Sequence, residues 1–478
     1  MPDRFVLVAL AAALVALGAH TATIQPWTVD DAYIAFRYAD HWASGLGPVY
    51  NPGEAVEGFT SLGWVLLLAA LAAVGVPLEA GAKVLGVLGV AGILAALATL
   101  RPPRAAVIAV SLTATAGPLT AWAAGGMEVA PAALVVLLVL AVGARVLDDP
   151  TPAGAVRAGL VASLGALVRP EFALVLPVVA IGLAARQRWR EAALAVCGGM
   201  VGYAPVEIWR LATYGWPFPN TAYAKVGASS EQIARGLDAM VAAGPAFLAL
   251  AFLAPLGLLA RSQGVRLALG WAALHVAFFV AVGGDGLPGH RLLVLLIAPL
   301  AACAGLGLDA LAARRPWSPL LVVPAMAAQV FATVTDPELT TRIREGNVGR
   351  NGREVGLWLR ETYGPDAVVA TNTAGSVAWF SGLVTIDMLG LCDAHIAHTP
   401  VERRGARKAG HEKGDGAYVL SREPDIVLFG AARGREQPFF PSDLDLWDLP
   451  AFHERYRFEQ HRLPSGATIR LYRRAVER

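Results

Sequence analysis

The sequence predicts a mainly α-helical membrane protein that ends in a small α/β domain, and two observations lead to this fold class. The 478 residues are 56% hydrophobic and only 16% charged, whereas soluble domains are typically about 25% charged. The charges are also uneven, because residues 1–334 carry 19 Lys/Arg and 17 Asp/Glu, while the much shorter segment 335–478 carries 20 of each. We therefore predict a polytopic membrane domain over 1–334 and a soluble α/β domain over 335–478.

The apolar runs set the expected number of membrane crossings, since a spanning helix needs about 20 apolar residues. Eleven runs are predicted to span: 5–24, 80–100, 105–123, 129–147, 155–168, 171–185, 191–212, 241–260, 267–283, 291–312 and 317–334. The first run, after Arg4, resembles a signal peptide. The many apolar segments that follow favour an uncleaved first span instead.

Arginine clusters predict the orientation, because cytoplasmic loops collect Lys and Arg. Five loops carry them: Arg101/Arg104, Arg145/Arg157, Arg186/Arg188/Arg190, Arg261/Arg266 and Arg314/Arg315. With Arg4, all five lie in the cytoplasm if the apolar run 60–76 dips into the outer face without crossing. The expected protein is thus a multi-pass protein of the cell membrane with a cytoplasmic N-terminus and an extracytoplasmic domain 335–478.

In this topology the unusual loops gather on the outer face. The first contains DDAYIAFRYADHW (30–42), which predicts an amphipathic surface helix with Asp30 and Asp31 at its N-terminal end. Aspartates near a bilayer are costly and usually functional, and a carboxylate there can accept a proton from a hydroxyl. The alternative is a helix cap and a solvated loop acid.

The longer string DDAYIAFRYADHWASGLGPVYNPGEAVEGFTSLGW (30–64) resembles the GT-C glycosyltransferases, which take sugars from polyprenyl-phosphate donors. Within that class it resembles the AftB-like arabinofuranosyltransferases and their relatives known as flagellar motor control proteins. The resemblance continues in order through GGMEV, LVRPEF, YGWPFPNTAYAK, VGGDGLPGHRLL, IDMLGLCDAHIAH and GHEK. Two departures are expected: Asn372 replaces an acid, and the carbohydrate-binding module of mycobacterial members is absent or replaced.

The resemblance implies which residues carry the reaction. Asp30 is the first candidate for the catalytic base, and Asp31 is the second. Arg169 is the first candidate for the contact with the donor phosphate, since a guanidinium matches phosphate oxygens; its alternative is an arginine that snorkels to the membrane interface. Lys225 and Arg291 are further candidates for the phosphate contact.

Six residues of the same outer loops are candidate substrate contacts: Glu128, Glu171, Asp285, Trp216, Asn220 and His290. Structural alternatives remain open for them. Glu128 could complement a helix dipole, Glu171 could pair with Arg169, and Trp216 could belong to an interfacial aromatic belt. No metal-ligand spacing is visible, and the resemblance implies neither a metal nor another cofactor.

The tail predicts strands at DAVVAT (366–371) and PDIVLF (424–429), and helices at RNGREVGLWLRETY (350–363) and GSVAWFSG (375–382). Its basic segment 402–413 predicts a loop that is either solvated or lies over the acceptor. Three cysteines, two of them in apolar runs, predict no disulfide framework, and the net charge of +2 gives no indication of a nucleic-acid partner.

The predicted function is a membrane glycosyltransferase that moves a sugar, with arabinofuranose as one candidate, from a polyprenyl phosphate to an envelope glycan or lipid-linked acceptor. The expected partners are that donor, that acceptor and the lipid bilayer. The alternative is a non-catalytic scaffold of the same fold in envelope or motility assembly, which would have no need of the acids. A transporter is disfavoured because the chain shows no clear repeat.

Overall fold

The computed structural model describes residues 3–24, 26–227, 229–343, 347–401 and 410–475, so most of the basic segment 402–413 lies outside the described residues. The chain forms two compact units. Unit 1 comprises Met1–Pro26, Ala82–Trp209 and Gly236–Glu345, and unit 2 comprises Trp27–Gly81, Arg210–Arg235 and Gly346–Arg478. Unit 2 therefore combines the tail with two segments of the first part of the chain, and the predicted division after residue 334 stays a prediction.

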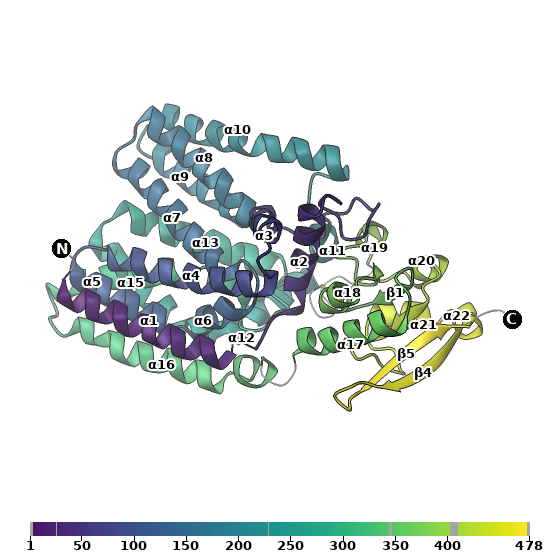
Figure 1. Ribbon diagram of the computed structural model, residues 1–478. Coiled ribbons are helices and arrows are strands. Elements are labelled where there is room, and N and C mark those ends of the chain that lie inside the picture. The colour runs from purple at the N-terminus through teal and green to yellow at the C-terminus, as the bar shows by residue number, and fades with distance from the viewer. Residues whose placement is uncertain (1–2, 25, 228, 344–346, 402–409, 476–478) are drawn as a thin grey trace. The chain divides into compact units, whose positions relative to one another are not determined.

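Unit 1 is helical (Figure 1). Its helices, some of which continue into unit 2, are α1 (Arg4–Ile24), α4 (Leu78–Ala98), α5 (Pro103–Ala114), α6 (Gly117–Ala124), α7 (Val129–Asp148), α8 (Pro152–Val168), η1 (Pro170–Leu174), α9 (Val175–Ala184), α10 (Trp189–Tyr214), α12 (Ser230–Leu253), η2 (Ala254–Ala260), α13 (Gln263–Ala281), α14 (Arg291–Val294), α15 (Ile297–Ala312), η3 (Ser318–Leu321), α16 (Val322–Thr335) and η4 (Glu338–Arg342). Small residues let these helices approach closely. A Cβ at Gly305 of α15 would lie 2.4 Å from the carbonyl oxygen of Ala105 in α5.

The helices confirm a multi-pass membrane protein. Among the described residues, eight are long and apolar enough to cross a bilayer, and the bent pair α5–α6 makes a ninth. The predicted runs 155–168 and 171–185 correspond to shorter apolar helices, so the count of eleven crossings stays a prediction. The helix α3 (Leu62–Ala73) has 12 residues, about 18 Å, against a hydrocarbon core of about 30 Å. That length is compatible with the predicted non-crossing run 60–76.

Unit 2 contains a five-stranded sheet in the order β2-β1-β3-β5-β4. The strands are β1 (Val368–Thr371), β2 (Val384–Asp387), β3 (Ile426–Leu428), β4 (Tyr456–Arg462) and β5 (Thr468–Arg474). The first three are parallel, and β5 pairs antiparallel with β3 and β4. Three parallel strands thus end at one edge, which we call the carboxyl edge of the sheet.

Helices cover both faces of this sheet. Neighbouring residues of a strand point to opposite faces, and each face has its own apolar core. Val369 packs with Val355 and Leu359 of α17 (Val348–Thr362) and with α18 (Ser376–Ser381). Ala370 packs in a second core with residues of the remaining tail helices, α19 (Ala394–His398), α20 (Gly416–Ser421), α21 (Pro441–Trp447) and α22 (Pro450–Arg455). The predicted α/β tail, with strands at 366–371 and 424–429, is confirmed.

The helix α2 (Asp30–Ala43) begins at the predicted acid pair, but its central part is buried, and its exposed residues lie in the last turn, from Asp40 on. Every residue from Ala32 to Ala39 is buried. The guanidinium of Arg37 donates hydrogen bonds to the carbonyl oxygens of Tyr50 (2.7 Å), Ala378 (2.6 Å) and Leu383 (2.9 Å). The prediction of a surface helix was wrong because helical periodicity does not reveal that a distant domain covers the polar face.

Candidate active site

The carboxyl edge of the sheet receives the first acid of the predicted pair. One carboxylate oxygen of Asp30 accepts hydrogen bonds from the backbone N–H of Ser376 (2.8 Å) and from its hydroxyl, and the other accepts from the N–H of Gly375 (3.1 Å). A Cβ at Gly375 would lie 1.9 Å from the carbonyl oxygen of Asp30, so this approach requires glycine. Burial raises the pKa of Asp30 to about 6, against the lowering effect of the Ser376 hydrogen bonds. Asp30 is therefore anchored through both oxygens.

The second acid is more open. The side chain of Asp31 is 23% exposed, and its carboxylate lies 3.8 Å from the ammonium nitrogen of Lys225, which is 34% exposed. Lys225 ends α11 (Asn220–Lys225). The structure thus brings a candidate base and a candidate phosphate contact together in unit 2.

Asn220 fixes the helix that carries Lys225. Its side-chain amide donates to the carbonyl oxygens of Gly390 (2.9 Å) and Leu391 (3.0 Å), which follow β2, and more weakly to that of Asp393 (3.2 Å). Its backbone N–H donates to the carbonyl oxygen of Glu57 (3.0 Å). The amide nitrogen of Asn220 therefore positions α11 against the carboxyl edge.

Trp216 belongs to an aromatic stack. Its ring stacks on the imidazole of His398 at 4.1 Å, and Tyr223 contacts both rings, at 4.3 Å from His398 and 5.6 Å from Trp216. Trp216 is 46% exposed, which leaves part of the indole open for a sugar ring or a lipid headgroup. Its role as a substrate contact stays a prediction.

Arg169, the first candidate for the phosphate contact, forms a closed cluster in unit 1 with Glu128 and Glu171, two candidate substrate contacts. The Nε of Arg169 donates to Glu171 (2.6 Å) and its Nη1 donates to Glu128 (2.7 Å). All three side chains are buried, with Arg169 only 7% exposed. The pairing of Arg169 with Glu171, left open as an alternative, is present, and Glu128 completes it.

A second arginine of unit 1 is also paired. Asp285 accepts hydrogen bonds from Nε (3.1 Å) and Nη2 (3.3 Å) of Arg291, and from the backbone N–H of Leu292 (3.2 Å). His290, the residue before α14, has a left-handed backbone with φ of 52°. Its ring lies edge-on to Phe247 at 6.4 Å.

Sequence reasoning missed the partners that the tail supplies. Ser376 and Gly375 hold Asp30, whereas the sequence predicted only a helix at GSVAWFSG (375–382). Asp387, at the end of β2, accepts from the N–H of Leu389 (3.0 Å) and Cys392 (2.8 Å) and thereby shapes the next loop of the edge. No group of three or more His, Cys, Asp or Glu residues able to hold a metal ion occurs in the part of the chain that the structure describes; metal independence stays a prediction.

Comparisons with known proteins agree with this architecture. Residues 340–472 match a family described as a domain of unknown function, DUF8728. The terminal beta-(1→2)-arabinofuranosyltransferase of Mycobacterium tuberculosis is 28% identical over 326 residues, which are 58% of this chain and 52% of that protein. The protein of the same name from Corynebacterium glutamicum is 27% identical over 369 residues, 65% of this chain and 52% of its own length. The chain thus spans about half the length of these curated relatives.

Solved structures establish the fold. ArnT from Cupriavidus metallidurans, bound to undecaprenyl phosphate, aligns with a TM-score of 0.55 at 15% identity, over 80% of this chain and 85% of that one. The archaeal oligosaccharyltransferase AglB from Archaeoglobus fulgidus, in complex with an inhibitory peptide and a dolichol-phosphate, aligns with a TM-score of 0.57 at 13% identity, over 99% and 74%. The chain has a GT-C fold. Its predicted resemblance to GT-C proteins and to the AftB-like family is confirmed.

Proposed function

We propose that the protein is a membrane glycosyltransferase that moves a sugar from a polyprenyl-phosphate donor to a hydroxyl group of a glycan or lipid-linked acceptor. The names of the curated relatives support glycosyl transfer, with arabinofuranose as the sugar. The GT-C fold, seen in a neighbour bound to undecaprenyl phosphate, supports a lipid-phosphate donor. The observation that carries the proposal is the open pair of Asp31 and Lys225 beside the carboxyl edge of the sheet. We also propose that this edge of the sheet lies on the extracytoplasmic side of the membrane.

In the proposed reaction, the acceptor oxygen forms a bond to the anomeric carbon while the bond from that carbon to the phosphate oxygen breaks. A carboxylate takes the acceptor proton, and polyprenyl phosphate leaves with the bonding electron pair. We assign the base to Asp31 and anchoring to Asp30, the reverse of the order expected from the sequence. The reason is access, since Asp30 already accepts three hydrogen bonds and Asp31 is partly exposed.

Lys225 is the proposed contact for the departing phosphate, because a fixed cation at a developing negative charge stabilises the transition state. The alternatives, Arg169 and Arg291, already hold carboxylates at hydrogen-bond distance. A phosphate at either would meet the repulsion of those carboxylates. Lys225 pairs with Asp31 at the longer distance of 3.8 Å and can turn toward a phosphate with little loss.

The test is a panel of donors. The full chain, purified in detergent, is incubated with polyprenyl phosphates that carry arabinofuranose or a hexose, together with a lysate-derived glycan fraction as acceptor. We expect release of polyprenyl phosphate from at least one donor and no consumption of the matching nucleotide-linked sugars. If no lipid-linked donor is consumed while the protein remains folded, the scaffold alternative gains and the proposed function fails.

A further inference from the structure

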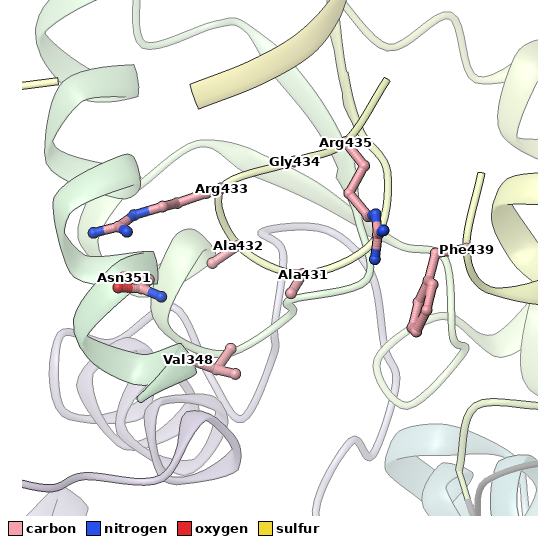
Figure 2. Close-up of a pocket in the computed structure, with 8 residues that line it drawn as sticks. All are labelled: Val348, Asn351, Ala431, Ala432, Arg433, Gly434, Arg435 and Phe439. Carbon is pink, nitrogen blue, oxygen red and sulfur yellow. The ribbon is translucent and has the colours of Figure 1, made fainter. Parts of the chain in front are cut away.

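Unit 2 contains a cavity of about 220 Å³ at the end of β3, apart from the acid pair. Figure 2 shows its lining: Val348 and Asn351 from the first turn of α17, the loop Ala431, Ala432, Arg433, Gly434 and Arg435, and Phe439. Ligands of open α/β sheets bind outside the carboxyl ends of the strands, at the point where the connections diverge. This cavity lies at such a point, because β1 is flanked by β2 on one side and β3 on the other.

The wall of the cavity is held in shape by a buried acid. Asp443 accepts hydrogen bonds from the backbone N–H of Gly430 (2.9 Å), Phe439 (3.0 Å) and Phe440 (3.0 Å). Its other oxygen accepts from the side-chain amide of Asn372 (2.6 Å). The loop is therefore tied at both ends to one carboxylate, and the cavity is preformed. A preformed site avoids the cost of ordering a loop when a ligand binds.

The cavity offers two polar groups that have no polar partner among the described residues. The guanidinium of Arg435 lies over the ring of Phe439, with its central carbon 4.6 Å from the ring centroid. The side-chain amide of Asn351 lies on the other side of the cavity, across from Arg435 (Figure 2). Arg433 differs, since it points away from the cavity in that view and pairs with Glu354 at 3.2 Å. Between the two polar groups in Figure 2 lie Val348, Ala431 and Ala432.

We infer that this cavity binds one sugar residue that carries a carboxylate or a phosphate group. The guanidinium of Arg435 can donate two parallel hydrogen bonds to either group. The amide of Asn351 can form a hydrogen bond with a sugar hydroxyl, and the apolar side chains of Val348, Ala431 and Ala432 can pack against the face of a sugar ring. The volume is below the ~300–1,000 Å³ typical of sites for drug-sized ligands, which fits a single sugar residue.

The cavity also has a place in the proposed reaction, and this part of the inference rests on the proposed function. Asn372, which donates to Asp443, lies in the connection between β1 and α18. Gly375 of the same connection and Ser376, the first residue of α18, hold Asp30. The wall of the cavity and the anchor of the acid pair are thus neighbouring loops of one sheet edge. The bound residue would be an acidic sugar of the acceptor glycan, next to the residue that receives the transferred sugar.

Binding is measured without any donor, so the result does not depend on transfer. The full chain in detergent is titrated with glucuronic acid, glucose 6-phosphate, methyl glucoside and inorganic phosphate, and saturation-transfer NMR reports each contact. We expect at least one of the two acidic sugars to bind about tenfold more tightly than methyl glucoside or phosphate. We expect Arg435→Gln to weaken that binding about tenfold or more, as the loss of a charge-assisted hydrogen bond does.

Two further variants sharpen the test. Asn351→Asp adds a negative charge opposite Arg435 and should weaken the acidic sugars while sparing methyl glucoside. Arg473→Gln is the matched control, because Arg473 also lies over an aromatic ring, that of Tyr363 at 5.8 Å, but does not line the cavity. Unfolding midpoints show that each variant is folded. Equal affinity of acidic and neutral sugars, tight binding of phosphate alone, or unchanged binding by folded Arg435→Gln would each overturn the inference.

Discussion

The cluster around Arg169 in unit 1 and the pair of Asp31 and Lys225 in unit 2 both join acidic and basic side chains, but in opposite ways. In unit 1, one guanidinium meets two carboxylates at 2.6 and 2.7 Å, and the cluster is buried. In unit 2, Asp31 and Lys225 stand 3.8 Å apart and are partly exposed. A charge within a membrane domain must be neutralised by permanent partners, whereas an open pair can exchange its partner for a substrate. The Arg169 cluster therefore stabilises the fold, whereas Asp31 and Lys225 are available for chemistry.

The largest effect is expected at the open pair. Asp31→Asn should reduce transfer by about 100-fold to 10,000-fold, because it removes the proposed base, and should leave the unfolding midpoint unchanged. Initial rates of polyprenyl phosphate release measure the loss. Asp40→Asn is the matched control, since Asp40 is an exposed acid of the same helix. Normal turnover by Asp31→Asn would return the role of base to Asp30.

Substitution of Arg169 in the closed cluster should lower the stability of the protein, not the rate of transfer by the folded protein. Arg169→Ala leaves Glu128 and Glu171 buried without their cation, and breaking a buried ion pair typically costs about 3–5 kcal/mol of folding free energy. Thermal unfolding in detergent measures this, with Arg145→Ala at an exposed position of α7 as the control. Should Arg169→Ala unfold normally and lose only donor affinity, the arginine would be the phosphate contact after all.

Asp30 stands between these two cases, so its substitution should affect both stability and rate. In Asp30→Asn, an amide nitrogen must face the N–H of Gly375 or of Ser376, and an unsatisfied buried donor costs about 1–3 kcal/mol. Ser376→Ala removes only the hydroxyl donor, keeps both backbone bonds, and should cost less. Unfolding midpoints of the two variants give the order. A more stable Asp30→Asn protein would argue against the anchoring role.

The smallest effect is a pH dependence of stability. Burial raises the pKa of Asp30 from 3.8 to about 6. It raises the pKa of Asp387 by the same amount, also to about 6. The folded state therefore keeps protons that the unfolded chain releases, so these two groups lower stability as pH rises from about 4 to about 7. Asp30→Asn should show a shallower fall than the parent over that window. Unfolding midpoints at pH 4.5, 6 and 7.5 measure it, and parallel curves would refute the assignment to Asp30.

Local sequence signals predicted the elements well, and the predictions failed where distant segments meet. The apolar runs located the helices, and the tail strands at 366–371 and 424–429 followed from β-type composition. The start of α2 at Asp30 was also predictable. Its burial was not, because its partners Ala378 and Leu383 are more than 340 positions away. The pairing of Arg169 with Glu171 could be weighed from their spacing, whereas Glu128 is 41 positions away and gave no local signal.

The anchor of Asp30 also sets an order of events during synthesis. The acid leaves the ribosome 346 residues before Ser376, which donates to it through both its backbone and its hydroxyl. Until that serine has been made and the tail has folded around α2, the acid pair has no fixed geometry. A partly made chain therefore carries every helix of unit 1 while it lacks an ordered acid pair.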